Sequence, residues 1–345
     1  MTPPHSLLLR ALMMERVARR PFWLMRQAGR YLPEYRAVRE KCGGFLAMAK
    51  SPPVACEITL QPVRRFDTDA AIIFSDILTI PDAMGLGLHF IDGEGPKLQN
   101  PLRDENAVGR LRPVAEGELD YVYDACRLAV GELPADIPLI GFCGSPWTLA
   151  CYMIDGGGGG FWRARKMVYD RPDLLHRILA ANAEAAVSLL CGQLAAGCRV
   201  AMIFDSWGGL LGGDDYETFS LRYIRDIINA VKAQHNDAPI IVFARQCHRH
   251  LAAIAKSGCD AAGIDWQTPM SQARDITGGK IALQGNMDPA VLLADADAVR
   301  REAKRILCDF GDGHGHIFNL GHGVDKNTPP ENVAVLADAV RGHKL

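Results

Sequence analysis

Eight short apolar runs recur along the chain, with polar or helix-forming segments between them. Each run has four or five residues and a composition typical of strands that are buried on both faces of a parallel sheet. The runs are FWLM at 22–25, AAIIF at 70–74, PLIGF at 138–142, VAMIF at 200–204, PIIVF at 239–243, AAGI at 261–264, KIALQ at 280–284 and HIFNL at 316–320.

Segments with helical spacing of apolar residues lie between these runs. The clearest cover 172–197 and 216–235, and an opening helix with a Leu/Met face is expected over 6–16. A strand followed by a helix, repeated eight times, closes into a barrel. We therefore predict the α/β class and a single (β/α)8 TIM barrel over residues 1–345, with an active site at the C-terminal ends of the strands. An open, doubly wound sheet is the alternative for this pattern.

Polar and glycine-containing turns follow the apolar runs directly, and in a barrel these turns gather on one face. The turns read RQAGR, SDI, CGSPW, DSWGG, ARQCH, DWQ, GNMD and GHGV. The side chains expected to point into one bowl are Arg26, Arg30, Asp76, Ser145, Asp205, Ser206, His248, Asp265, Asn286 and His322.

The composition of the chain argues against nucleic acid and membranes as binding partners. Of 345 residues, 48% are hydrophobic and 23% charged, and the net charge is −2, which gives no general attraction to nucleic acid or an anionic membrane. The chain lacks an uncharged apolar stretch of the length that spans a membrane. Its ten cysteines form no CxxC pair and suit free thiols in a reducing compartment. We expect a cytoplasmic protein without nucleic-acid or membrane partners.

Two arginines four residues apart, Arg26 and Arg30, follow the first predicted strand. In a helical turn both guanidinium groups would share one face and form a receptor for a polyanion. Asp76 ends the second run, where a carboxylate is costly unless it is paired. It could be a general base, a metal ligand or an acceptor for ligand N–H groups, or simply a helix cap or salt-bridge partner.

Other candidates lie in later turns. Five consecutive glycines at 156–160 lack the sequence of a nucleotide-binding loop and indicate a mobile flap, with Tyr152 before it. Ser206 is a candidate hydrogen-bond donor. His322 stands between two glycines that would let a ligand approach closely.

The segment ARQCHRH at 244–250 raises the hypothesis of a zinc site. Cys247, His248 and His250 supply donor atoms, but no further ligand follows at a workable spacing. Cys259 precedes the next predicted strand and belongs to the other end of the barrel. We therefore expect no metal.

Over nearly the whole chain, from about Leu9 to about Arg341, the sequence resembles the uroporphyrinogen decarboxylases. Residues 21–36, PFWLMRQAGRYLPEYR, are close to the opening signature of that family, and MRQAGRY is the most specific part. Further blocks follow in the family's order: GFCGSPWTLACYMIDGGG at 141–158, FDSWGG at 204–209, GIDW at 263–266, QGNMDP at 284–289 and NLGHG at 319–323.

The resemblance implies a carboxy-lyase of porphyrin and heme biosynthesis, homodimeric and free of cofactors, that decarboxylates uroporphyrinogen. It implies a catalytic set of Asp76, Arg26, Arg30, Tyr152 and His322. Substrate binding would fall to Arg26, Gln27, Ala28, Gly29, Arg30, Phe45, Asp76, Tyr152, Ser206 and His322. Asp76 would accept hydrogen bonds from the pyrrole N–H groups at the centre of the macrocycle.

Two departures from the family stand out, in that the glycine run extends to five residues and Cys247 replaces a frequent glycine. Two other functions remain as alternatives. A zinc-dependent corrinoid or thiol methyltransferase of the same superfamily would carry its ligands as His-x-Cys plus a later Cys, whereas here Cys247 precedes His248. A non-catalytic tetrapyrrole-binding protein could keep the arginine pair but would not need the polar set around Asp76.

Overall fold

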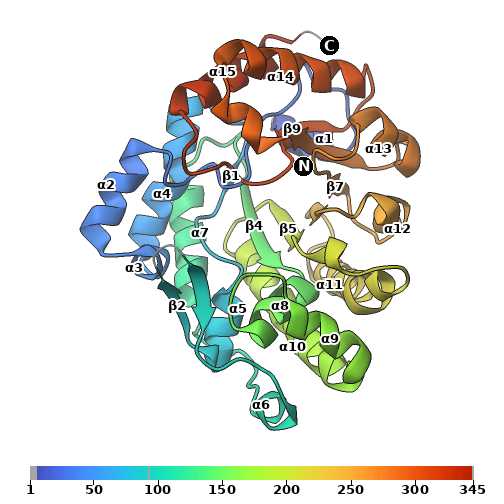
Figure 1. Ribbon diagram of the computed structural model, residues 1–345. Coiled ribbons are helices and arrows are strands. Elements are labelled where there is room, and N and C mark those ends of the chain that lie inside the picture. Colours follow the sequence, from blue (N-terminus) through green and yellow to red (C-terminus); the bar gives the residue numbers. More distant parts are fainter. Residues whose placement is uncertain (1–5, 92–93, 344–345) are drawn as a thin grey trace.

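A parallel sheet of seven strands forms the centre of the computed structural model, which describes residues 6–91 and 94–343 (Figure 1). Neighbouring strands follow the order β1-β4-β5-β6-β7-β8-β9, and every pair is parallel. The strands are β1 (Ala71–Ile72), β4 (Leu139–Gly144), β5 (Val200–Asp205), β6 (Ile240–Ala244), β7 (Ala261–Gly263), β8 (Ala282–Met287) and β9 (His316–Leu320). Seven of the eight predicted runs therefore form strands.

The first predicted run, at 22–25, closes the barrel without forming a regular strand. Phe22 makes a single parallel bridge to Phe318 of β9, and on its other side its carbonyl accepts from Asp69 N at 2.8 Å. After Phe22, a side chain takes the place of a backbone partner. The Asn319 Oδ1 atom accepts a hydrogen bond from Met25 N at 2.9 Å. The segment thus links the last strand of the sheet to the residues that precede the first.

Helices cover the outside of the sheet. They are α1 (Leu7–Leu12), α2 (Pro33–Cys42), α3 (Phe45–Ala49), α4 (Pro52–Phe66), α5 (Thr79–Pro81), α6 (Glu105–Gly109), α7 (Asp120–Glu132), α8 (Pro146–Asp155), α9 (Trp162–Asp170), α10 (Pro172–Ala195), α11 (Arg222–Gln234), α12 (Leu251–Ala255), α13 (Met270–Thr277), α14 (Ala296–Phe310) and α15 (Pro330–Arg341). Short 3-10 or π segments precede or replace some of them: η1 (Asp82–Leu86), η2 (Gly208–Leu210), η3 (Glu217–Leu221), η4 (His248–His250) and η5 (Pro289–Leu293).

The predicted helices are present, with adjusted ends. The opening helix is shorter than predicted and spans only Leu7–Leu12, with the Ser6 hydroxyl accepting from Leu9 N at its start. Helix α10 has the length and hydropathy of a membrane span, but it packs against α8, α11 and β4 and buries its leucines there. Packing against the barrel therefore explains why this helix is so apolar.

A two-stranded hairpin, β2 (Leu88–Ile91) and β3 (Gly95–Leu98), was not predicted from the sequence. It lies apart from the barrel sheet, beside α3 and α8 (Figure 1). The hairpin also contacts the glycine run, because Leu98 N donates to Gly156 O at 2.9 Å and Lys97 bridges Gly157. Two of the five glycines are thus held in place, and the run joins α8 to α9. A mobile flap there stays a prediction.

Candidate active site

The turn that carries the arginine pair leaves the first barrel segment in a left-handed conformation. Arg26 has φ +57°, which turns the chain sharply, and helix α2 begins only at Pro33. The two arginines therefore do not lie on one helical turn, as the sequence suggested. Both side chains are exposed, and the described residues form no ion pair with either guanidinium group. They are available to an anionic ligand.

Gln27, by contrast, is committed to the fold. Its side chain is 1% exposed, donates to Ala70 O at 3.1 Å and accepts from Leu24 N at 3.2 Å. Its carbonyl accepts from the Tyr31 hydroxyl at 2.7 Å. Gln27 thereby fixes the turn between the first barrel segment and β1, while the neighbouring Ala28 and Gly29 are half-buried.

The glycines around His322 have a packing role that the sequence did not indicate. A Cβ at Gly323 would lie 2.4 Å from Cδ and 2.7 Å from Cγ of Arg26, so Gly323 makes room for the arginine stem. A Cβ at Gly321 would lie 2.6 Å from Trp266 N. Both glycines therefore allow other protein segments to approach closely, and the approach of a ligand there stays a prediction.

Asp76 lies just beyond β1 and has one strong partner in the fold. Its Oδ1 accepts from Leu78 N at 2.8 Å, and its carbonyl accepts from the Thr79 hydroxyl at 2.9 Å. Burial raises the pKa of Asp76, while the Leu78 N–H and the charge of Arg26 act in the opposite direction. A carboxylate in this setting gains from further hydrogen-bond donors, which a ligand can supply.

Tyr152 belongs to α8, whose start is fixed by the Ser145 hydroxyl accepting from Thr148 N. The phenol packs edge-on against Phe161 at 5.2 Å and faces Trp207 at 6.5 Å. Burial raises the pKa of Tyr152, and the charges of Asp76 and Arg26 both act on it. The three groups therefore belong to one electrostatic environment.

His322 completes this environment from the end of β9. Its ring lies edge-on to Phe243, with centroids 6.2 Å apart. Burial, together with the charges of Arg26 and Arg245, lowers the pKa of His322 to about 4. The imidazole is therefore neutral at pH 7.

Two other residues that were predicted to contact a substrate lie at the same end of the barrel. Ser206 follows β5 and is half-buried. Phe45 begins α3 and packs against Phe74 at 5.3 Å and Phe90 at 4.8 Å, so it belongs to an aromatic wall that joins the hairpin to β1. The hairpin thus contributes to the surroundings of Phe45.

Four residues expected in the bowl are instead buried structural groups: Ser145, Asp205, Asp265 and Asn286. The Asp205 carboxylate accepts from the hydroxyls of Ser145 at 2.6 Å and Ser220 at 2.8 Å. The Asn286 amide donates to Asp265 O at 2.8 Å. The prediction was wrong because polar residues after a strand also satisfy the backbone and side chains of neighbouring turns.

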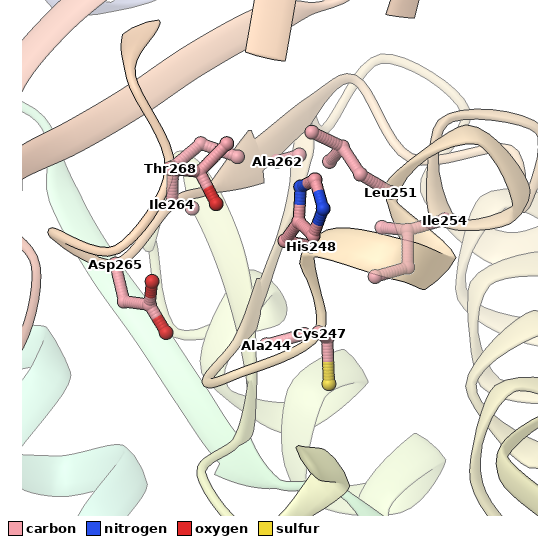
Figure 2. A pocket seen from close by; sticks show the side chains of 10 residues that line it. Ala244, Cys247, His248, Leu251, Ile254, Ala262, Ile264, Asp265 and Thr268 are labelled. Atoms are coloured by element: carbon pink, nitrogen blue, oxygen red, sulfur yellow. The ribbon is translucent and has the colours of Figure 1, made fainter. Parts of the chain in front are cut away.

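The prediction that His248 points into the bowl was also wrong. It lines a cavity of about 10 Å³ between α12 and the outer side of β6 and β7, and Figure 2 shows its ring beside Leu251 and Ile254. The Cys247 sulfur points away from that ring and donates to Arg245 O at 3.2 Å. Across 6–91 and 94–343, no three His, Cys, Asp or Glu side chains gather as metal ligands.

Arg245 is a charged residue at the barrel end that was not predicted from the sequence. It follows β6 directly, just as Arg26 follows the first barrel segment, and this position was the available signal. Its guanidinium carbon lies 5.9 Å from the ring centroids of both Trp207 and Trp266. Its positive charge contributes to the lowered pKa of His322.

The parallel barrel, with charged and aromatic side chains gathered at the C-terminal ends of its strands, places the chain in the class of α/β-barrel enzymes. Within that class the chain belongs to the uroporphyrinogen decarboxylase family, whose model, described as Uroporphyrinogen decarboxylase, matches residues 3–343. The protein is therefore a carboxy-lyase by family.

Full-length relatives agree with this assignment. The chain is 51% identical over 338 residues to a uroporphyrinogen decarboxylase of Legionella pneumophila (strain Lens), covering 97% of this chain and 96% of the relative. It is 52% identical over 342 residues to one of Alkalilimnicola ehrlichii, covering 98% and 93%. The one of Paraburkholderia xenovorans is 51% identical over 352 aligned residues, with 98% and 96% covered.

Similarity to solved structures supports the assignment of the fold and nothing further. A methyltransferase from Methanosarcina mazei superposes with a TM-score of 0.82, covering 98% of both chains at 19% identity. A putative B12-independent methionine synthase from Listeria monocytogenes gives a TM-score of 0.57 at 12% identity, covering 96% of this chain and 100% of that one. These identities carry no argument for methyl transfer.

Proposed function

We propose that the protein converts the four acetate side chains of uroporphyrinogen III to methyl groups, giving coproporphyrinogen III and four molecules of CO2. The observation that carries the proposal is Asp76, a half-buried carboxylate that accepts from Leu78 N and on which the charge of Arg26 acts. Arg30 and Arg26 would bind substrate carboxylates, and Asp76 the pyrrole N–H groups.

The pyrrole ring itself would accept the electrons, so the reaction needs no cofactor. A proton adds to the ring carbon that bears the acetate, and the resulting cation receives the electron pair of the C–CO2 bond as CO2 leaves. Protonation of the exocyclic carbon and loss of the ring proton then give the methyl group. The anionic Asp76 would stabilise the cationic ring, and the arginines would hold the acetate in position.

Tyr152, Ser206, His322 and Phe45 would contact the substrate around these groups, together with the main chain of Gln27, Ala28 and Gly29. The Gln27 side chain is engaged in the fold, so only its backbone is free for this purpose. We further propose that residues 1–345 act as one barrel domain in the cytoplasm, although residues 1–5, 92–93 and 344–345 lie outside the described structure.

A turnover assay tests the proposed function. Metal-stripped protein is mixed with freshly reduced uroporphyrinogen in the dark without oxygen, and the oxidised products are separated by carboxylate number. We expect porphyrins with seven, six, five and four carboxylates to appear in turn. Unchanged but bound substrate would favour a tetrapyrrole-binding protein. A substrate that neither binds nor reacts would direct the next assay to zinc- and corrinoid-dependent methyl transfer.

The partner that we propose is a second copy of the chain. The proposal rests on family membership, and sedimentation velocity at micromolar concentration tests it. A species of twice the chain mass is expected. A monomer alone would contradict the proposal without affecting the assignment of the reaction.

The low pKa of His322 predicts the pH dependence of the enzyme. Because the pKa is about 4, His322 stays neutral from pH 5.5 to 8, and kcat/KM should show no inflection from this residue. We expect His322→Gln to lower kcat/KM by about 10-fold while leaving the shape of the profile unchanged. A wild-type inflection near pH 6.5 that disappears in His322→Gln would contradict this prediction.

The same shift has a consequence for folding. The ordinary pKa of histidine is 6.5, so the unfolded chain takes up a proton at His322 as the pH falls from 6.5 toward about 4, whereas the folded chain does not. Stability should therefore decrease over this window by up to about 1.4 kcal/mol per pH unit. Denaturant unfolding of the wild type and His322→Gln should show a shallower decrease in the variant.

A further inference from the structure

We propose that Arg245 is a third arginine that binds a carboxylate of the substrate, at the same end of the barrel as Arg26 and His322. The inference rests on the proposed function, since it assigns a subsite for one peripheral carboxylate of a polycarboxylate ring. It also names a residue that determines affinity for that ring. Four observations on the position, packing, bonding and charge of Arg245 support it.

The position of Arg245 directs its side chain toward the barrel axis. Arg245 N donates to Asp205 O at 3.3 Å, so the parallel ladder between β5 and β6 continues to this residue, and alternation along the strand places Arg245 on the side of Phe243. Phe243 contacts His322 at the barrel end, with ring centroids 6.2 Å apart. Ala244 faces the opposite way and lines the small outer cavity of Figure 2. Arg245 is therefore on the same side as His322.

Two tryptophans fix the guanidinium group. Trp207 and Trp266 each have a ring centroid 5.9 Å from its carbon, within the range of a cation–π contact, and two such contacts limit where the guanidinium group can lie. Trp207 is itself held, because its backbone N–H donates to the Thr148 hydroxyl at 3.3 Å and its carbonyl accepts from Trp147 Nε1 at 2.9 Å. The cation is therefore pre-organised at little entropic cost to a ligand.

The guanidinium group lacks the partners that comparable arginines have. Arg19 binds the Asp69 carboxylate with two hydrogen bonds, at 2.6 and 2.7 Å, and Arg20 donates to two backbone carbonyls. Within the described ranges the Arg245 guanidinium group forms no ion pair, and its buried Nε has no acceptor. A half-buried cation without an anion is costly, and a bidentate carboxylate would satisfy it.

The positive charges of Arg245 and Arg26 together indicate what kind of ligand carries the anion. Arg26 and Arg245 come from opposite halves of the sequence, yet the charges of both act on the His322 ring. The two guanidinium groups belong to different strand ends, so a ligand that binds both with carboxylates must carry at least two separated anionic groups. A flat ring with carboxylates on its edge meets this requirement, through either an acetate or a propionate.

The test compares Arg245→Met and Arg245→Lys with the control Arg249→Met. Arg249 is exposed in the same loop, where it is part of η4. A hydrogen bond to a charged group contributes about 1.5–3 kcal/mol, so we expect Arg245→Met to raise KM for uroporphyrinogen by roughly 10- to 100-fold. Arg245→Lys should recover part of the affinity by restoring charge without the planar fork. Arg249→Met should match the wild type.

A second readout separates binding from a structural role. NMR titration of His322 should show a higher pKa in Arg245→Met, because one of the two neighbouring cations is gone, while the melting temperature stays near that of the wild type. Unchanged KM in Arg245→Met, or a KM change that accompanies loss of folding in Arg245→Lys as well, would overturn the proposal.

Two substrates identify the carboxylate. If Arg245 binds a propionate, KM should rise equally for eight- and five-carboxylate porphyrinogens, since propionates persist through the reaction. If it binds an acetate, the effect should be larger for the eight-carboxylate substrate. Both results support a carboxylate subsite. Absence of turnover by the wild-type protein would instead refute the proposed function, so the two failures are distinguishable.

Discussion

Asp76→Asn is expected to lower kcat for uroporphyrinogen decarboxylation by about 100- to 1,000-fold while the protein still folds and binds substrate. Asparagine keeps the size of the side chain and an oxygen that can accept from Leu78 N, as Oδ1 does at 2.8 Å. It removes the negative charge that would stabilise a cationic pyrrole, and a preorganised electrostatic group of this kind contributes 10²–10³-fold or so to kcat.

The measurement is single-turnover decarboxylation, with binding followed separately by fluorescence of the oxidised porphyrin. Asp136→Asn is the matched control, because Asp136 is an exposed carboxylate in the loop before β4. Normal turnover by Asp76→Asn would refute the assigned role. A variant that no longer binds would show that Asp76 acts in binding rather than in the chemical step.

Asp76 also predicts an acidic limb in the pH profile. Burial raises its pKa above the ordinary value of 3.8, so the charged form is lost at a higher pH than for an exposed aspartate. Activity should therefore decrease as the pH falls through this raised pKa. The residual activity of Asp76→Asn should lack this limb. Comparison of the two kcat profiles between pH 4 and 8 tests the sign of the effect.

Arg26→Met is expected to lower kcat/KM by about 100-fold, the second largest effect, since a bidentate hydrogen bond to a carboxylate contributes about 3 kcal/mol. Gly323→Ala should have a related but smaller effect of about 10-fold, because the added methyl group would lie 2.4 Å from Arg26 Cδ. The close contacts extend down the stem to Cγ at 2.7 Å and Cβ at 3.1 Å, so the methyl group would displace the Arg26 side chain near its base.

Steady-state kinetics of these variants should be compared with Gly158→Ala. A Cβ at Gly158 meets no atom within 4 Å, so this control tests glycine replacement without displacing an arginine. Wild-type kinetics in Gly323→Ala would show that the position of the Arg26 stem does not matter for binding. Loss of folding in Gly323→Ala alone would leave Arg26→Met as the direct test of the anion site.

The barrel could be predicted from sequence because the signal is local. Buried parallel strands must be apolar on both faces, and seven of the eight runs that meet this requirement form strands in the predicted order. The run at 22–25 was recognised for the same reason, but its pairing is reduced to one bridge because Asn319 and Asp69 side chains take over the backbone contacts. The hairpin β2–β3 was missed because its short strands are stabilised by α3 and the glycine run.

The sequence alone determined the barrel, its family and the residue types at the strand ends, including Arg26, Arg30, Asp76 and His322. Tertiary structure decided which of these face the barrel end. Beyond the last paired residue of a strand, side-chain direction depends on what the next turn packs against, so Asp265 turns to the backbone and His248 turns outward. The roles of Gly323 and Arg245 also depend on contacts between distant segments. Gly323 packs against the Arg26 side chain, and Arg245 lies beside two tryptophans, only in the folded chain.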